Sequence, residues 1–241
     1  ALIDIGVNLT NGRFDKDRDE VLLRAKQAGL HALLITGTNL IESQKAVSLC
    51  QPMPDFLYST AGVHPHDADQ VPEDFVDQIS QLATHSCVKA IGECGLDFNR
   101  NFSSPKQQIK VFDAQIQLAN ELNMPLFLHQ RDAFDTWMDM LAPFVHEIPA
   151  MVSHCFTANL SQLKQCLDAG MYIGITGWVC DNKRGQELQD IVKYIPLDRL
   201  MIETDAPYLT PKTMRPKPKS SRNEPSYLPH IVDILAMHSG Y

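Results

Sequence analysis

Carboxylates and imidazoles stand at the ends of four separate apolar stretches of the sequence. Glu93, His129, His154 and Asp205 each end or directly follow a different stretch of this kind. Imidazole nitrogens combined with carboxylate oxygens suit Zn²⁺, Mn²⁺ or Fe²⁺, whereas carboxylates with water suit Mg²⁺. These residues are therefore candidate metal ligands, provided that the fold brings the four stretches together at their ends.

Each of these residues also has a purely structural interpretation. A histidine at a strand end is usually a hydrogen-bonded structural residue, and an aspartate before Ala-Pro usually forms a turn. The combination favours a metal, because uncompensated carboxylates and imidazoles at one place would lose solvation free energy that a divalent cation restores. Cys94 and Cys155 alternate to the other face of their strands, so we expect no thiolate ligand.

The apolar stretches also predict the elements that must position these side chains. Eight short, nearly continuous apolar runs, typical of buried parallel strands, alternate with amphipathic segments. We expect strands over residues 2–8, 32–37, 57–63, 88–94, 126–129, 151–155, 172–176 and 200–204. We expect helices over residues 16–28, 40–50, 72–83, 105–122, 134–141, 160–169, 185–192 and 228–237.

Eight strand–helix units in 241 residues predict one α/β domain over residues 1–241, a (β/α)8 TIM barrel. Such a barrel gathers the carboxyl ends of its strands at one rim, where the chemistry takes place. No GxGxxG or GxxxxGK[ST] motif follows the first run, which excludes the usual dinucleotide and P-loop sites.

Composition restricts the kinds of partner. The net charge of −8 argues against a broad basic face for nucleic acid, because such binding neutralises many phosphates. Nucleic acid would have to bind locally, through a metal or one basic patch. The six cysteines form no CxxC pair, and no apolar run approaches the roughly 20 residues of a membrane span. The N-terminal residues do not have the pattern of a signal peptide. We expect a soluble cytoplasmic monomer without a membrane partner.

Six phrases of the sequence, in their order and spacing, resemble the TatD-type deoxyribonuclease family: GVHPHD, AIGECGLDF, LHQRDA, SHCFTA, YIGITGWV and IETDAPYL. The resemblance covers nearly the whole chain, and each phrase falls at an expected strand end. It implies a TIM barrel of the metallo-dependent hydrolase type and a metal-dependent exonuclease that acts 3′ to 5′ on single-stranded DNA or RNA. By family analogy, it also implies a part in DNA repair or fragment clearance.

The sequence departs from the family pattern at both ends. Most of the wider family has a metal-binding His-x-His at the end of the first strand, and alignment on Asp4 places Gly6 and Asn8 at those positions. The family also continues for about one more helix beyond the point where this chain stops.

The other ligands of the family pattern are present. Glu93, His129 and His154 match one metal position, and Asp205 faces the other. The resemblance thus implies one tightly held divalent ion and a second, weaker one recruited with substrate phosphate. Mg²⁺ is favoured in function, with Mn²⁺ or Zn²⁺ as alternatives. Glu93 and Asp205 are candidate catalytic residues, Glu93 through the ion that activates water and Asp205 as general base or water orienter.

Two residues near these ligands are candidate phosphate contacts. His64 is a candidate catalytic and substrate-binding residue that donates a hydrogen bond to the scissile phosphate, whereas His66 is interpreted as structural. Arg131 carries a planar guanidinium suited to phosphate. A structural pair with Asp132 or Asp135 is the alternative for that arginine.

The segment 207–225 is a further candidate contact with nucleic acid. It follows the eighth strand, where a barrel carries an active-site loop, and it concentrates basic residues in an acidic chain. The basic residues of this loop are Lys212, Arg215, Lys217, Lys219 and Arg222, of which Lys217 and Arg222 are the chosen candidates. Phe98, Phe102 and Trp178 are candidates to stack on bases, with packing or loop anchoring as the alternative.

Two other functions stay open. A small-molecule amidohydrolase or lactonase uses the same barrel and ligand types, but commonly with a bridging lysine that is missing where Glu93 and His129 end their strands. A catalytically degenerate barrel that binds nucleic acid or a protein is supported only by the missing His-x-His. Retention of four other candidate ligands argues against it.

Overall fold

The computed structural model describes residues 1–241, which form two compact units. Unit 1 comprises residues 1–35, 155–168 and 172–241, and unit 2 comprises residues 36–154 and 169–171. Eight strands alternate with helices along the chain and follow one another in the sheet order β1 to β8. This order and alternation are those of a (β/α)8 TIM barrel, so the fold class predicted from the sequence is confirmed.

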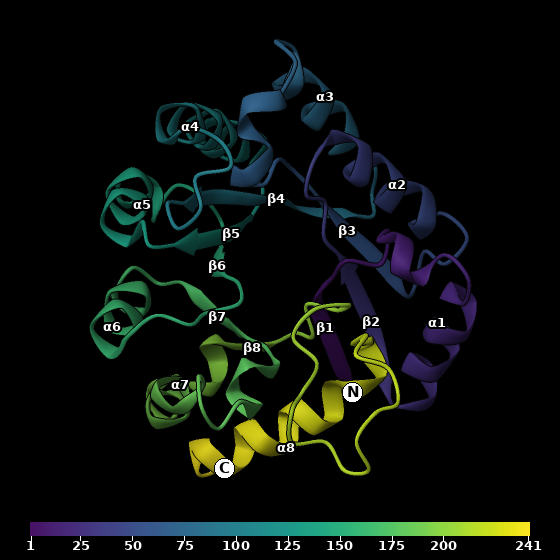
Figure 1. Ribbon diagram of the computed structural model, residues 1–241. Coiled ribbons are helices and arrows are strands. Elements are labelled where there is room, and N and C mark those ends of the chain that lie inside the picture. Colours follow the sequence, from purple (N-terminus) through teal and green to yellow (C-terminus); the bar gives the residue numbers. More distant parts are fainter. The chain divides into compact units, whose positions relative to one another are not determined.

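Unit 2 contains four consecutive parallel strands, which are β3 (Leu57–Ala61), β4 (Val88–Asp97), β5 (Leu126–Arg131) and β6 (Met151–Ser153). β4 pairs with both β3 and β5, and β5 pairs with β6. Figure 1 shows the helices of this unit on one side of the strands, namely α2 (Leu40–Cys50), α3 (Phe75–Leu82), α4 (Pro105–Leu122) and α5 (Phe134–Leu141). Because the strands are parallel, their carboxyl ends lie at the same end of the unit's sheet.

Unit 1 contains β7 (Tyr172–Ile175) paired with β8 (Leu200–Ile202), and β1 (Leu2–Val7) paired with β2 (Leu30–Ile35). The first strand lies beside the last, because the Asp205 amide donates to the Gly6 carbonyl and the Asn8 amide to the Ala206 carbonyl, both at 2.8 Å. The helices of this unit are α1 (Arg18–Gln27), α6 (Leu160–Asp168), α7 (Gln186–Ile191) and α8 (Leu228–Ser239). None of the helices in the chain combines the length and the apolar character that crossing a membrane requires.

All sixteen expected elements are present, and their bounds differ from the predicted ones by at most three residues. The largest difference in a strand is in β4, which continues past Cys94 to Asp97 because its last residues keep pairing with the end of β5. The strands β3, β6 and β8 end earlier than expected, where the chain turns into polar loops.

Helix α4 fastens the ends of two strands with buried glutamines. Gln108 accepts a hydrogen bond from the Asp97 amide at 2.9 Å and donates to its carbonyl at 3.0 Å. Gln115 makes the same pair of bonds with Val63, at 2.8 and 3.1 Å. Ile109 of this helix is 36% exposed, because the buried glutamines share the inner face with the apolar residues.

Asp4 joins β1 to the chain that follows β8. Its carboxylate is fully buried, with Oδ1 accepting hydrogen bonds from the amides of Gly6 at 3.2 Å and Thr204 at 2.9 Å. Its Oδ2 accepts from the Thr204 hydroxyl at 2.5 Å. Burial raises the pKa of Asp4 to about 7, although the hydrogen bonds from Thr204 and Gly6 oppose this change.

We predict that Asp4→Asn reduces the pH dependence of stability. Folded Asp4 holds its proton more tightly than the unfolded chain does, so its contribution is complete below pH 3.8 and is lost as pH rises through about 7. Asparagine does not titrate. In urea unfolding, the free energy of the wild type minus that of the variant should fall by roughly 1–3 kcal/mol between pH 5 and pH 8. A difference that does not vary with pH would show that Asp4 is ionised throughout.

Candidate metal centre

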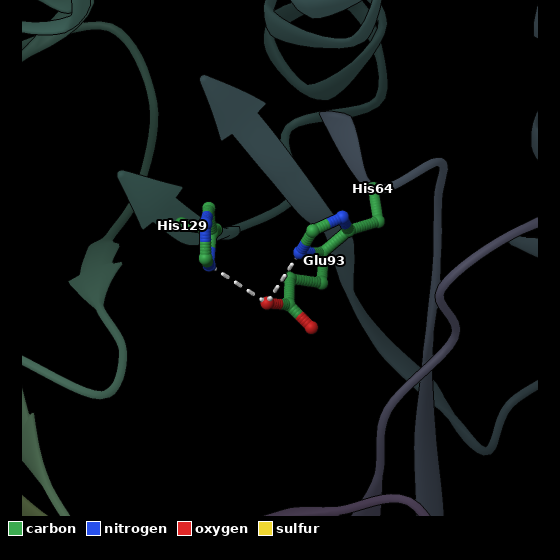
Figure 2. A group of neighbouring side chains, drawn as sticks. All are labelled: His64, Glu93 and His129. Carbon is green, nitrogen blue, oxygen red and sulfur yellow. Dashed lines mark ion pairs between the residues drawn. The ribbon is translucent and has the colours of Figure 1, made fainter. Parts of the chain in front are cut away.

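Three imidazoles of unit 2 converge on one carboxylate oxygen. Oε1 of Glu93 lies 2.7 Å from Nε2 of His154, 3.2 Å from Nδ1 of His129 and 3.5 Å from Nε2 of His64. Figure 2 shows the rings of His64 and His129 directed at this carboxylate from two sides. Glu93 belongs to β4 and His129 to β5, whereas His64 and His154 follow the ends of β3 and β6. The structure therefore brings together three of the four predicted ligands and adds His64.

Two glycines let β5 approach β4 closely around Glu93. At Gly92, with φ of +142°, a Cβ atom would lie 2.2 Å from the carbonyl oxygen of Phe127. At Gly95, with φ of +150°, it would lie 1.7 Å from the carbonyl oxygen of His129. Only glycine satisfies both the conformation and the distance. This close approach sets the spacing between the Glu93 and His129 side chains.

The surroundings keep Glu93 ionised although it is only 5% exposed. Burial would raise the pKa of Glu93, but electrostatic interactions with His154 and His64 and hydrogen bonds from His129 and His154 hold that pKa well below its ordinary value. Burial lowers the pKa of His64 to about 3, against the partial opposition of Glu93. The centre thus combines an anionic carboxylate with an imidazole that is neutral at physiological pH.

A second carboxylate stands behind His129. Oδ2 of Asp97 lies 3.1 Å from Nε2 of His129 and 3.1 Å from Nε2 of His66. Burial would raise the pKa of Asp97, but the hydrogen bond and the charge of His129 hold it well below its ordinary range. Burial would lower the pKa of His129, and its bonds to Asp97 and Glu93 raise it instead.

Asp97 was not among the residues predicted from the sequence, although the sequence carried a signal for it. Asp97 comes four residues after Glu93, and this even spacing places both carboxylates on the same face of an extended strand. The bond between Asp97 and His66 agrees with the structural interpretation of that histidine.

The donor set fits a divalent metal. His64, Glu93 and His129 each offer one ligand atom, and these atoms lie within 4.8 Å of one another. His154 contacts the same oxygen of Glu93. Imidazoles with a carboxylate are typical ligands of Zn²⁺, Mn²⁺ and Fe²⁺, and a carboxylate behind a ligating histidine is the usual outer partner.

The fourth predicted ligand, Asp205, belongs to unit 1, so its contact with the cluster stays a prediction. It follows β8 with φ of +55°, and its Oδ1 accepts a hydrogen bond from Nδ2 of Asn8 at 3.1 Å. At Gly6, a Cβ atom would lie 3.1 Å from Oε2 of the buried Glu203. The two positions where the wider family has histidines are thus occupied by a different polar network.

The predicted substrate contacts differ in their surroundings. Arg131 is exposed at the end of β5, and Asp132 accepts a hydrogen bond from Asn99 at 2.7 Å. Lys217 is exposed in the segment 207–225, which is called the basic loop below. Arg222 forms a two-pronged ion pair with Asp17, at 2.7 and 2.8 Å, so its guanidinium already has a partner within the protein.

Known proteins support the resemblance seen in the sequence. The chain matches the family described as TatD related DNase over residues 3–241. It is 56% identical over 239 residues to the 3′-5′ ssDNA/RNA exonuclease TatD of Pectobacterium carotovorum. The matched region covers 99% of this chain and 92% of that relative. It is 52% identical over 239 residues to the protein of the same name from Salmonella typhimurium, with the same coverage.

Solved structures agree in fold. A TatD family hydrolase from Entamoeba histolytica superposes with a TM-score of 0.87 at 29% identity, covering 99% of this chain and 91% of the other. A TatD homologue from Escherichia coli gives a TM-score of 0.87 at 25% identity, covering 98% and 90%. The chain therefore belongs to the TatD related DNase family and is a metal-dependent hydrolase of the nuclease type.

Proposed function

We propose that this chain is a 3′–5′ exonuclease that hydrolyses phosphodiester bonds of single-stranded DNA or RNA. The observation that carries the proposal is the ionised, buried Glu93 with three imidazoles around one of its oxygens. The relatives named 3′-5′ ssDNA/RNA exonuclease supply the reaction and its direction. Family membership favours this activity over a small-molecule amidohydrolase and over a degenerate binding protein.

Glu93, His129 and His154 are proposed to hold the metal. A bound divalent ion supplies Lewis-acid activation of water and of a nonbridging phosphate oxygen. Mg²⁺ is the proposed working ion. Mn²⁺ and Zn²⁺ are the alternatives, because the imidazoles in this set suit them.

His64 is proposed to donate a hydrogen bond to the scissile phosphate. Its Nδ1 accepts a hydrogen bond from the His66 amide at 3.1 Å, and its low pKa keeps the ring neutral. In a neutral ring whose Nδ1 accepts, the proton sits on Nε2. That nitrogen faces Glu93, beside the proposed phosphate site. Because Nε2 carries a proton, it can donate a hydrogen bond to a phosphate oxygen, whereas a metal ion would need its free lone pair.

Asp205 is proposed as the general base or water orienter. The amide of Asn8 donates to its carboxylate at 3.1 Å, which holds that carboxylate in one orientation. This role needs unit 1 and unit 2 to act as one hydrolase domain, as predicted from the sequence.

Arg131 and Lys217 are the proposed contacts to the nucleic-acid backbone, because both are exposed. Arg222 remains a candidate that would have to exchange Asp17 for phosphate. We further propose a cytoplasmic monomer that acts in DNA repair or fragment clearance. The cysteine content without CxxC pairs supports the reducing compartment, and family analogy supports the process.

The first test follows single-stranded DNA labelled at its 5′ or 3′ end. With Mg²⁺ or Mn²⁺, the protein should shorten the 5′-labelled strand progressively and release label at once from the 3′-labelled strand. EDTA should stop both, and Glu93→Ala should lower the rate by a factor on the order of 100 or more. Glu121→Ala, at an exposed position of α4, is the matched control. DNA left intact by the wild type under every metal condition would refute the proposed activity.

The second test concerns Asp97. In Asp97→Asn an amide N–H faces Nε2 of His129, which moves the ring proton to Nδ1, the atom directed at Glu93. We therefore expect Mn²⁺ to bind about 10- to 100-fold more weakly, as measured by isothermal titration calorimetry. Asp132→Asn, which changes an exposed carboxylate, should bind Mn²⁺ as the wild type does. Equal affinities in the folded Asp97 variant would remove Asp97 from the metal centre.

The third test concerns the basic loop. Lys217→Gln combined with Lys219→Gln should raise KM for single-stranded DNA several-fold at low salt and leave kcat nearly unchanged. The salt dependence of log(kcat/KM) should become shallower, by about 1 for each lysine that neutralises a phosphate. Lys89→Gln combined with Lys110→Gln removes the same charge from exposed positions elsewhere. If both double variants change KM equally, the loop makes no specific contact.

A further inference from the structure

The loop between β4 and α4 presents one aromatic ring to solvent. Phe102 is 58% exposed and is the one exposed phenylalanine among the ten of the chain, of which seven are buried. Single exposed apolar residues are common, so exposure alone gives this ring no function. The surroundings of Phe102 carry the inference.

The residue that follows Phe102 is firmly anchored. The Ser103 hydroxyl donates to the His66 carbonyl and accepts from the Asp69 amide, both at 2.9 Å. The Ser103 carbonyl accepts from Nε2 of Gln108 at 2.9 Å, and Ser103 itself is 1% exposed. Phe102 is therefore displayed from an ordered backbone, which keeps the entropy cost of stacking on it low.

Only the ring of His66 lies between the ring of Phe102 and the candidate metal ligands around Glu93. Its centroid lies 4.7 Å from that of His66, at an interplanar angle of 75°. The His66 ring lies 4.4 Å from that of His64 and 6.4 Å from that of His129. The bond from His66 to Asp97 fixes this intermediate ring. A nucleotide whose phosphate reaches the cluster thus has an aromatic surface within reach of a neighbouring base.

Arg100 adds a cation to the same surface. Its guanidinium carbon lies 5.8 Å from the centroid of the Phe102 ring. An exposed aromatic ring beside arginine is the combination by which proteins hold single-stranded nucleic acid without reading its sequence.

We propose that Phe102 is a stacking site for a nucleobase near the 3′ end of the strand whose phosphate binds at the Glu93 cluster. This inference rests on the proposed function and names the feature of the substrate that the site selects. A base must be unpaired and unstacked to lie on the ring, so this contact selects single strands over duplexes. Every base has an aromatic face, so it does not select among sequences.

The test couples the ring to the base. Oligonucleotides carry an abasic residue at the first, second or third position from the 3′ end. For the wild type, KM should rise about 5- to 100-fold at one of these positions. For Phe102→Ala, KM should already be raised on the intact strand and should not rise further at that position. Phe102→Trp should restore the wild-type pattern, and Ile41→Ala, which truncates another exposed apolar residue, should not alter it.

Additive effects of Phe102→Ala and base removal at all three positions would overturn the stacking site while leaving the exonuclease activity intact. A direct measurement makes the inference independent of hydrolysis. Fluorescence of 2-aminopurine at the coupled position, or at each of the three positions in turn, should be quenched by the wild type and not by Phe102→Ala when Ca²⁺ replaces Mg²⁺, so that the strand binds while hydrolysis is slow. Equal quenching by both proteins, or none by either, would also overturn it. Absence of hydrolysis by the wild type would refute only the proposed function.

Discussion

The buried charge of Glu93 constrains the whole of unit 2. A carboxylate that is 5% exposed loses most of its hydration, and only partners that are supplied by the protein or by an ion can compensate for that loss. The partners here come from the ends of three other strands. Their positions depend on the close approach of β5 at Gly92 and Gly95, and on the glutamines of α4 that fasten β3 and β4. The chemistry of the centre therefore depends directly on how these strands are aligned with one another.

His129 links the two carboxylates of the centre. One ring nitrogen faces Glu93 and the other faces Asp97, so the orientation of this ring is determined from both sides. Asp97 also holds His66, whose ring contacts Phe102 at the surface. The side chains form a continuous series of contacts from the proposed metal site to the proposed base site. Such continuity lets a phosphate and its neighbouring base be held in a fixed relation, which hydrolysis at one defined bond requires.

The altered end of β1 carries its own polar network. Asn8 is bonded to Asp205, and the space beside Gly6 is filled by the buried Glu203. Asp4 ties the same two segments of unit 1 together, because its carboxylate accepts two hydrogen bonds from Thr204 and one from the Gly6 amide of its own strand. The departure from His-x-His therefore comes with ordered partners in place of metal ligands, which agrees with a centre that relies on the ligands of unit 2.

The order and type of the elements, the fold class and the convergence of Glu93, His129 and His154 could be predicted from the amino-acid sequence. These follow from local periodicity and from the rule that parallel strands end at the same edge. The partners of individual side chains became known only from the folded structure. Asp97 bonds to His129, which is 32 positions away in the sequence, and Gln108 bonds to Asp97, which is 11 positions away. Arg222 pairs with Asp17 across 205 positions. The energy of such pairs depends on distance and burial in space, and neither is encoded in the spacing along the chain.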